Sequence, residues 1–170
     1  EPGRRMAAHT LRHARGRLGL AHVRIGVQTI EPWHRRVTWI SAAAVFGFRF
    51  SIACPPRYEP DVETLDRARS MGADIQVTDR PEEAVTGADA VYTDVWTSMG
   101  QEDEAPRRRR HFQGYQVNTR VMQKAKPDAV VMHCLPAHRG EEITNEVIEG
   151  PQSIVFDEAE NRLHVQKGIL

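Results

Sequence analysis

The chain has few cysteines and no long apolar run. Its 170 residues include only two cysteines, Cys54 and Cys134, and they form no C-x-x-C pair. A disulfide scaffold or a zinc ribbon needs more cysteines at closer spacing, so both are excluded. No apolar stretch approaches the roughly 18 residues that a membrane-spanning helix needs, and residues 1–16 contain no apolar signal core. We therefore expect a soluble protein of a reducing, cytoplasmic compartment without a membrane partner.

Aromatic residues are also absent from the arginine-rich start of the chain. Residues 1–50 carry nine Arg against two Glu, although the formal net charge of the whole chain is zero. A basic arm that binds nucleic acid usually has interleaved aromatics or a recognisable motif, and residues 1–17 have neither. We therefore expect no nucleic-acid partner and interpret this start as a disordered basic segment.

Apolar runs alternate with helical patterns along the rest of the chain, which is typical of an α/β fold. The pattern predicts a Rossmann-like, doubly wound, mainly parallel sheet of about five or six strands flanked by helices. The expected strands are residues 23–27, 48–54, 74–77, 90–93, 129–133 and 153–156. The expected helices are residues 60–71, 81–85, 118–125 and 144–148 and a segment after residue 158. Asp61 is expected to cap the first of these helices and Gly72 to end it.

Cys134 follows the predicted strand 129–133, which has Pro127 before it and Pro136 after it. An apolar run bounded in this way indicates a strand that is buried on both faces, and parallel sheets bind ligands beyond the carboxyl ends of such strands. We therefore predict that Cys134 lies in a ligand-binding crevice. Cys54 is interpreted as a small buried hydrophobic residue, because free cysteines are among the most buried side chains.

A second polar loop follows the predicted strand 90–93. Asp94 and Ser98 offer a carboxylate and a hydroxyl within five residues, and Gly100 allows a sharp turn. Asp94 would suit a small cationic substrate, or alternatively it would cap a helix. Because the neighbouring strand end could present Cys134, we predict that a thiol, a carboxylate and a hydroxyl converge in one crevice.

Four side chains could suggest a metal site, but their spacing matches no common zinc pattern. They are His133, Cys134, His138 and His164. The run 107–110 of four arginines follows three acidic residues and predicts a solvent-facing helix with i to i+4 ion pairs. Arg162 follows a predicted strand near the start of a helix, where it would favour an anionic ligand or form an ordinary helix salt bridge.

Three motifs together resemble the ornithine carbamoyltransferases. They are Asp94–Gly100, His133–Glu142 and Phe156–Arg162. The resemblance covers about residues 45–168 and corresponds to the second, ornithine-binding domain of the aspartate/ornithine carbamoyltransferase family. Aspartate carbamoyltransferases typically have proline at the position of Cys134, so the thiol favours the ornithine branch. The resemblance implies transfer of a carbamoyl group from carbamoyl phosphate to the δ-amino group of L-ornithine, which gives citrulline and phosphate, as in arginine biosynthesis.

The resemblance also implies roles for individual residues on the ornithine side of the site. Asp94 matches the residue that binds and orients the amino group, and Ser98 and the backbone of Met99 complete the ornithine site. Cys134 matches the residue that assists the reaction, because a thiolate beside the amine can accept its proton or hold it in place. Cys134 and Asp94 are thus the expected catalytic residues.

On the carbamoyl phosphate side, the resemblance implies contacts from Cys134, from the backbone carbonyl of Leu135 and from Arg162. Arg162 would stabilise the charge that develops in the tetrahedral transition state. The expected partners are the two small-molecule substrates, with no metal and no organic cofactor. The family is homotrimeric, but the resemblance gives no assembly for this chain.

The chain also departs from the family in ways that divide it in two. Residues 1–42 form a divergent Arg-rich segment. Our hypothesis is that this segment is disordered or read in a shifted frame. The asparagine that holds the ornithine carboxylate in the family is missing from it. Residues 43–170 form the ornithine-binding domain, without the family's carbamoyl-phosphate-binding domain and without the end of its last helix. We therefore expect a fragment that is inactive alone. The alternatives are a non-catalytic amino-acid-binding or interaction module and a carbamoyltransferase for a related amine such as putrescine.

Overall fold

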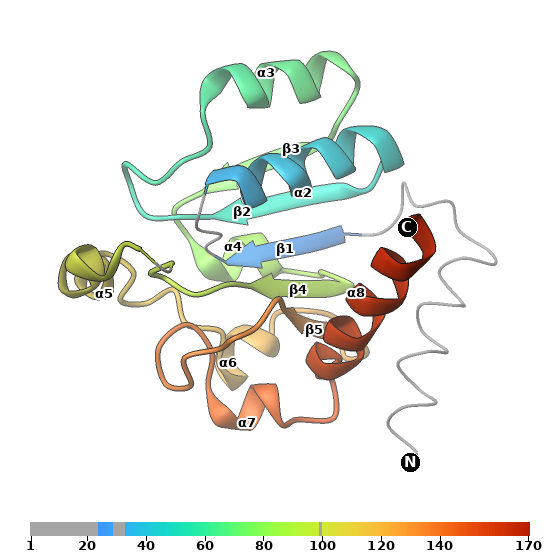
Figure 1. Ribbon diagram of the computed structural model, residues 1–170. Helices are drawn as coiled ribbons and strands as arrows, with labels where there is room; N and C mark the ends of the chain where they lie inside the picture. Colours follow the sequence, from blue (N-terminus) through green and yellow to red (C-terminus); the bar gives the residue numbers. More distant parts are fainter. Residues whose placement is uncertain (1–23, 29–32, 99) are drawn as a thin grey trace.

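A computed structural model describes residues 24–28, 33–98 and 100–170 (Figure 1). In chain order the elements are β1 (Arg24–Gln28), α2 (Trp33–Phe46), β2 (Arg49–Ala53), α3 (Val62–Ser70), β3 (Ile75–Thr78), α4 (Pro81–Val85), β4 (Ala90–Thr93), the 3-10 helix η2 (Glu102–Glu104), α5 (Ala105–His111), α6 (Thr119–Met122), β5 (Val130–His133), α7 (Asn145–Ile148) and α8 (Val155–Ile169). None of the helices in these ranges is long and apolar enough to cross a membrane.

The five strands form one parallel sheet in the order β3-β2-β1-β4-β5. This confirms the predicted α/β fold with a doubly wound sheet. The strand order reverses between β1 and β4, and open sheets of this kind bind ligands beyond the carboxyl ends of the strands at such a reversal. β1 and most of α2 precede residue 43. The sheet therefore includes part of the Arg-rich segment 1–42. The boundary at residue 42 and the shifted reading frame stay predictions, and residues 1–23 lie outside the described residues.

The sheet separates two apolar cores because alternate side chains of each strand point to opposite faces. One core packs under α2 and α3, and the other packs under α4, α6 and α7 (Figure 1). Large members of the first core include Ile40, Phe50, Ile52 and Tyr92. Members of the second include Val85, Val91, Val131, Ile143 and Ile148. Cys54 lies in the first core and is 4% exposed, which confirms its interpretation as a buried hydrophobic residue.

Gly26 lets helix α4 approach the central strand. A Cβ atom built on Gly26 would lie 2.7 Å from the carbonyl oxygen of Ala84 and 2.9 Å from the Cα of Val85. Cβ atoms in folded proteins essentially never lie within 3.0 Å of backbone atoms in this way, so only glycine fits at this position. The second face of the sheet is therefore closed by direct contact between β1 and the backbone of α4.

The residues predicted to cap and to end α3 are confirmed, although the helix is slightly shorter than the expected residues 60–71. The Asp61 side chain accepts a hydrogen bond from the Thr64 amide at 2.8 Å, and Gly72 follows the helix with a φ of 89°. Asp61 thus satisfies one of the free amides of the first turn, and Gly72 takes the left-handed conformation that ends many helices.

The predicted strand over residues 153–156 is wrong. Ser153 forms only an isolated bridge to Val131, and helix α8 begins at Val155. Ile154 packs into the first core and Val155 into the second, so this short apolar run belongs to a helix start that lies across the edge of the sheet. A run of this length cannot be assigned to a strand or a buried helix by periodicity alone.

Candidate active site

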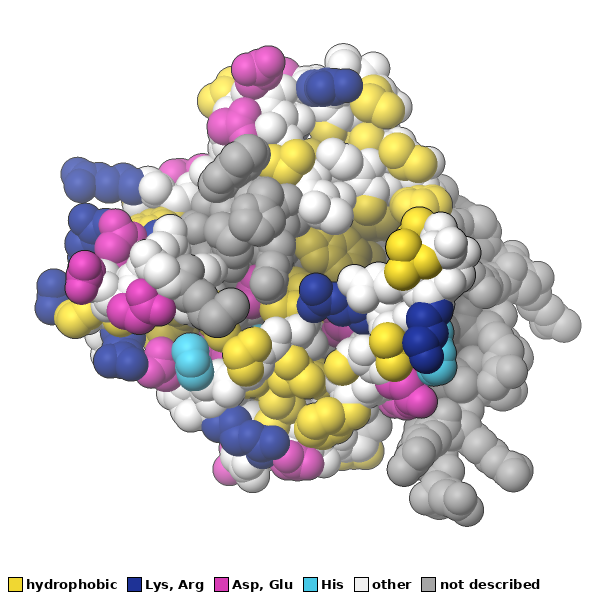
Figure 2. Space-filling view, in the orientation of Figure 1, with side chains coloured by type: hydrophobic (Ala, Val, Ile, Leu, Met, Phe, Trp, Pro, Cys, Tyr) yellow, Lys and Arg dark blue, Asp and Glu magenta, His cyan; other side chains and the backbone are white. Residues whose placement is uncertain are grey.

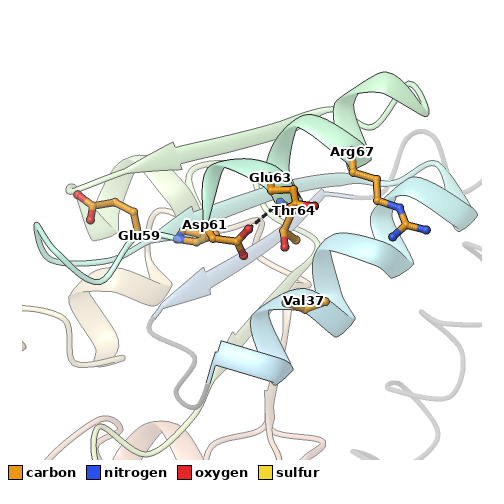
Figure 3. Close-up of a pocket in the computed structure, with 7 residues that line it drawn as sticks. Val37, Glu59, Asp61, Glu63, Thr64 and Arg67 are labelled. Carbon is orange, nitrogen blue, oxygen red and sulfur yellow. Dashed lines mark hydrogen bonds between the residues drawn. The ribbon is translucent and has the colours of Figure 1, made fainter.

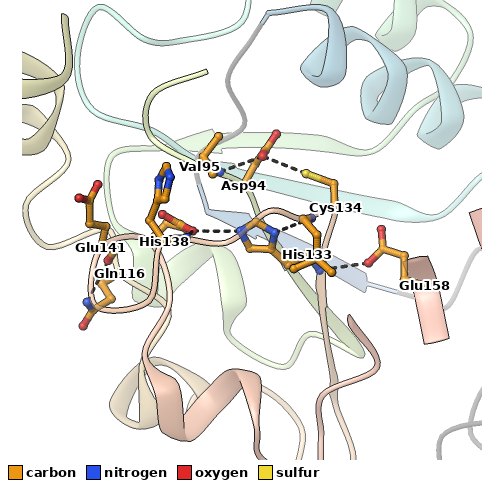
Figure 4. A network of polar contacts seen from close by, with 10 residues as sticks. Asp94, Val95, Gln116, His133, Cys134, His138, Glu141 and Glu158 are labelled. Carbon is orange, nitrogen blue, oxygen red and sulfur yellow. Dashed lines mark hydrogen bonds and ion pairs between the residues drawn. The ribbon is translucent and has the colours of Figure 1, made fainter. Parts of the chain in front are cut away.

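Asp94 and Cys134 are the first residues after two neighbouring strands. The register of β4 and β5 pairs Thr93 with His133, which brings the next residue of each chain segment to the same edge. The Cys134 Sγ donates a hydrogen bond to Asp94 Oδ1 at 2.9 Å, and the Val95 amide donates to the same oxygen at 2.8 Å. Asp94 is only 1% exposed, whereas Cys134 is half-buried. Figure 4 shows the two side chains pointing toward one another.

The loop that carries Cys134 is held by a chain of hydrogen bonds through His133 (Figure 4). The Leu135 amide donates to His133 Nδ1 at 2.9 Å, and His133 Nε2 lies 3.2 Å from Glu142 Oε1. Because Nδ1 accepts, Nε2 is the ring nitrogen that donates a hydrogen bond to Glu142. The His138 amide donates to the same Glu142 oxygen at 2.5 Å. Glu142 thus fixes both ends of the loop.

Leu135 has a backbone conformation that is unusual for a residue with a side chain. Its φ is 53°, in the left-handed region, and its peptide bond to Pro136 is cis. Left-handed conformations of residues other than glycine are costly, and they cluster at functional sites where the surrounding structure enforces them.

A cavity of about 380 Å³ opens beside Cys134. Its wall is one face of α8, where Glu158 and Arg162 are four residues apart and therefore neighbours on the helix surface. The space-filling view in Figure 2 shows a hollow in the molecular surface. Hydrophobic side chains form the bottom of this hollow, and Lys or Arg side chains lie beside it. Arg162 is exposed and lies seven residues beyond the start of α8. The expectation that a helix N-terminus acts together with Arg162 is therefore wrong, and only the guanidinium itself can attract an anion.

Glu158 adds a second acidic group to this edge of the sheet. Its Oε2 accepts a hydrogen bond from the His133 amide at 3.0 Å, and it reaches in from α8 (Figure 4). Burial raises the pKa of Glu158, and the nearby charge of Asp94 raises it further. Burial also raises the pKa of Tyr92, as do Cys134 and Asp94. Four ionisable side chains therefore influence one another at the ends of β4 and β5.

Sequence reasoning missed four side chains of this site. They are Tyr92, His133, Glu142 and Glu158. Signals existed for Glu158, which stands four residues before Arg162, and for His133, which directly precedes Cys134. The others contribute through contacts across the fold that spacing does not encode.

The other predicted site residues are Ser98, Leu135 and Met99. Ser98 lies on the same loop as Asp94, is half-buried, and accepts a hydrogen bond at its carbonyl from the Gln101 amide at 3.1 Å. Neither Ser98 nor Leu135 is among the described residues that line the cavity beside Cys134. Met99 lies outside the described residues.

Arg108 anchors the loop that begins with Asp94. The expectation of a solvent-facing α5 holds for three of its four arginines, but Arg108 is only 6% exposed. Its guanidinium forms an ion pair with Glu104 at 2.8 Å, donates to the Trp96 carbonyl at 3.4 Å and lies 5.5 Å from the centre of the Tyr58 ring. A buried guanidinium with these partners fixes the path of the loop after β4.

The histidines and Cys134 that the sequence places near one another do not form one ligand set. Both ring nitrogens of His133 are engaged, and His164 lies on α8 with Glu160 at 3.6 Å. In the described part of the chain, the group with metal-ligating atoms close enough together is a different one, made of His138, Glu141 and Glu142.

A larger concavity of about 560 Å³ lies between α2 and α3. Figure 3 shows Glu59 and Arg67 at opposite ends of it, and Asp61 is turned to the Thr64 amide. Its polar groups do not converge on one point, so the smaller cavity beside Cys134 is the better candidate for an active site.

Known proteins resemble this chain over most of its length. The profile of the family described as aspartate/ornithine carbamoyltransferase, Asp/Orn binding domain, matches residues 36–170. The ornithine carbamoyltransferase of Rhodopseudomonas palustris is 58% identical over 133 residues, which are 78% of this chain and 42% of that protein. That of Methanoculleus marisnigri is 53% identical over 133 residues, which are 78% of this chain and 43% of that protein. The chain thus spans less than half the length of these curated relatives.

Solved structures show the same likeness. The structure of ornithine carbamoyltransferase from Thermus thermophilus superposes with a TM-score of 0.79 at 39% identity, covering 97% of this chain and 52% of that one. The anabolic ornithine carbamoyltransferase of Campylobacter jejuni gives a TM-score of 0.81 at 34% identity, covering 96% of this chain and 55% of that one. Fold, motifs and the extent of the profile match agree, and the chain belongs to the aspartate/ornithine carbamoyltransferase family.

Proposed function

We propose that this chain supplies the ornithine-binding part of an ornithine carbamoyltransferase. The reaction would transfer a carbamoyl group from carbamoyl phosphate to the δ-amino group of L-ornithine and release citrulline and phosphate. The observation that carries the proposal is the 2.9 Å hydrogen bond from Cys134 to Asp94 at the ends of two neighbouring strands. The names of the curated relatives support the choice of acceptor.

The acidic character of the site suits a cationic acceptor such as ornithine. Asp94 is a buried carboxylate at the sheet edge, and a charge-assisted hydrogen bond from an ammonium group to such a carboxylate is among the stronger interactions available. Ser98 and the backbone of Met99 complete the ornithine site in this proposal.

Cys134 would act on the amine that attacks. An ammonium group must lose a proton before its nitrogen can form a bond to the carbamoyl carbon. As that bond forms, the bond from the carbamoyl carbon to the phosphate oxygen breaks and phosphate leaves. The ammonium proton passes to the Cys134–Asp94 pair, and the second proton, which the nitrogen loses as the new bond forms, leaves with the phosphate.

Arg162 and the carbonyl of Leu135 would act on carbamoyl phosphate. Arg162 lines the cavity beside Cys134, so its guanidinium can approach the carbonyl oxygen that gains negative charge in the transition state. The Leu135 carbonyl would accept a hydrogen bond from the carbamoyl NH₂ group. The cytoplasmic location that the sequence predicts belongs to this proposal too, and light scattering tests whether this chain assembles as the homotrimeric family does.

Isothermal titration calorimetry with L-ornithine tests the proposal. We expect wild-type binding, and a loss of roughly 10- to 100-fold in Asp94→Asn because a hydrogen bond between charged groups is lost. Asp66→Asn, an exposed change on α3, is the matched control and should leave the affinity unchanged. Equal ornithine affinity in Asp94→Asn and wild type would refute the assignment of Asp94.

Two further measurements separate the alternatives. Tighter binding of putrescine than of L-ornithine would favour a carbamoyltransferase for that diamine, because putrescine lacks the amino-acid end of L-ornithine. A citrulline assay with carbamoyl phosphate distinguishes a catalytic chain from a binding module. Turnover by this chain alone would contradict our expectation that it needs a separate carbamoyl-phosphate-binding domain.

A further inference from the structure

Three potential metal ligands gather on the loop that follows the Cys134 segment. His138, Glu141 and Glu142 each offer one ligand atom, and these atoms all lie within 4.8 Å of one another. Their burial is graded, since His138 is exposed, Glu141 is half-buried and Glu142 is 0% exposed. The group is thus open to solvent on one side and closed on the other. None of the three lines the cavity beside Cys134.

Glu142 has one carboxylate oxygen without a partner. Its Oε1 accepts hydrogen bonds from His133 Nε2 and from the His138 amide, whereas its Oε2 is buried and has no hydrogen-bond partner in the described structure. A buried polar atom without a partner is costly, and a buried carboxylate oxygen is more costly still because it carries negative charge. A cation at this position would remove that cost.

We propose that His138, Glu141 and Glu142 bind one divalent transition-metal cation of the Zn²⁺ type. Two carboxylates balance the charge of a divalent ion, and a mixture of imidazole and carboxylate ligands suits Zn²⁺. Ligand atoms about 2.1 Å from a tetrahedral Zn²⁺ lie roughly 3.4 Å apart, so side-chain rotations of the exposed ligands suffice to close the group around an ion. A water molecule would fill the fourth position.

Arg109 is the competing partner for Glu141. Its Nη2 and Nε lie 2.8 and 2.9 Å from Glu141 Oε1, so the other oxygen of Glu141 is the one offered to the metal. An exposed ion pair of this kind contributes little free energy, and a metal ion can displace it. The site also bears on the Cys134 loop, because Glu142 holds both His133 and His138.

Calorimetric titration with Zn²⁺ tests this site in the Cys134→Ser background, which removes the thiol as a competing ligand. We expect one ion per chain at this site, with an affinity that falls at least about tenfold in His138→Gln and in Glu141→Gln. These two ligands are the accessible ones, so their replacement leaves the buried Glu142 in place and the fold intact. Co²⁺ in place of Zn²⁺ gives an independent reading, since its visible absorption should appear in the parent and be lost in both variants.

Two control variants make the test specific. His164→Gln removes an exposed histidine that lies 3.6 Å from Glu160 on α8 and should leave the Zn²⁺ affinity unchanged. Arg109→Gln should leave it unchanged or tighten it, because it frees Glu141. Zn²⁺ binding that is equal in His138→Gln, Glu141→Gln and the parent, or that is absent at millimolar Zn²⁺, would overturn the proposal. None of these outcomes depends on carbamoyl transfer.

Discussion

At the scale of single residues, the Cys134–Asp94 pair links the sequence motifs to chemistry. Both residues could be predicted, because each follows an apolar run whose carboxyl end faces the ligand-binding edge of a parallel sheet. Their 2.9 Å contact could not be predicted, because it depends on the register of β4 against β5. His133, Glu142 and Glu158 were missed for the same reason, since each acts through a partner distant in the chain.

The first prediction concerns the reactivity of the Cys134 thiol. The adjacent Asp94 carboxylate accepts a hydrogen bond from the thiol, and its negative charge disfavours the thiolate. Asp94→Asn should therefore speed alkylation by iodoacetamide by roughly threefold to tenfold. Mass spectrometry of the alkylated peptide at pH 7.5 measures the rate. Cys54 is buried and serves as the internal reference, because its slow labelling should not change. Equal Cys134 rates in the variant and the wild type would show that Asp94 does not control the thiol.

The second prediction concerns Glu158 and the pH dependence of stability. Burial raises its pKa in the folded chain, so the folded state holds a proton that the unfolded state has already lost. The stabilisation that protonated Glu158 gives the folded state is therefore fully present below the ordinary Glu pKa. It is lost as the pH rises through the raised pKa of Glu158 in the folded chain.

Glu158→Gln should accordingly flatten the fall in Tm as the pH rises from the ordinary Glu pKa through the raised pKa of Glu158. The introduced glutamine side chain keeps an oxygen that can accept from the His133 amide, so the fold should persist. Glu160→Gln on the exposed side of α8 is the control and should follow the wild-type curve. A Glu158→Gln curve parallel to that of wild type would contradict the raised pKa.

At the scale of elements, the local patterns were reliable wherever they agreed with the tertiary environment. Residues 81–85 and 90–93 form α4 and β4 with the predicted bounds, and Asp61 caps α3 as expected. The run 153–156 failed because Ile154 and Val155 are buried on opposite faces of the sheet while the chain turns into α8. Arg108 was misjudged because its burial comes from Tyr58 and Trp96, which lie far from it in the sequence.

The third prediction concerns the contact between β1 and α4. Gly26→Ala should destabilise the chain by about 1–3 kcal/mol, because the added Cβ would push against the backbone of Ala84 and Val85. Urea denaturation followed by circular dichroism measures the free energy of unfolding. Gly168→Ala is the matched control, since a Cβ there meets nothing within 4 Å and alanine is the better helix former. A Gly26→Ala variant as stable as Gly168→Ala would show that α4 is not seated on β1 as described.

At the scale of the whole molecule, the reversal of strand order explains why the site lies where it does. Between β1 and β4 the connections diverge to opposite faces, and the polar loops after β4 and β5 collect beside that point. The fold class could be predicted from the alternation of apolar runs and helical patterns. The strand order could not, because neighbours in the sheet such as β1 and β4 are distant in the sequence.

The central claim is that L-ornithine binds at the ends of β4 and β5. Titration of ¹⁵N-labelled chain with L-ornithine, followed by amide chemical shifts, tests it most directly. We predict saturable shifts concentrated in residues 94–98, 133–136 and 158–162, and their loss in Asp94→Asn. Shifts confined to other segments such as the α2–α3 concavity, or none at millimolar L-ornithine, would contradict the account.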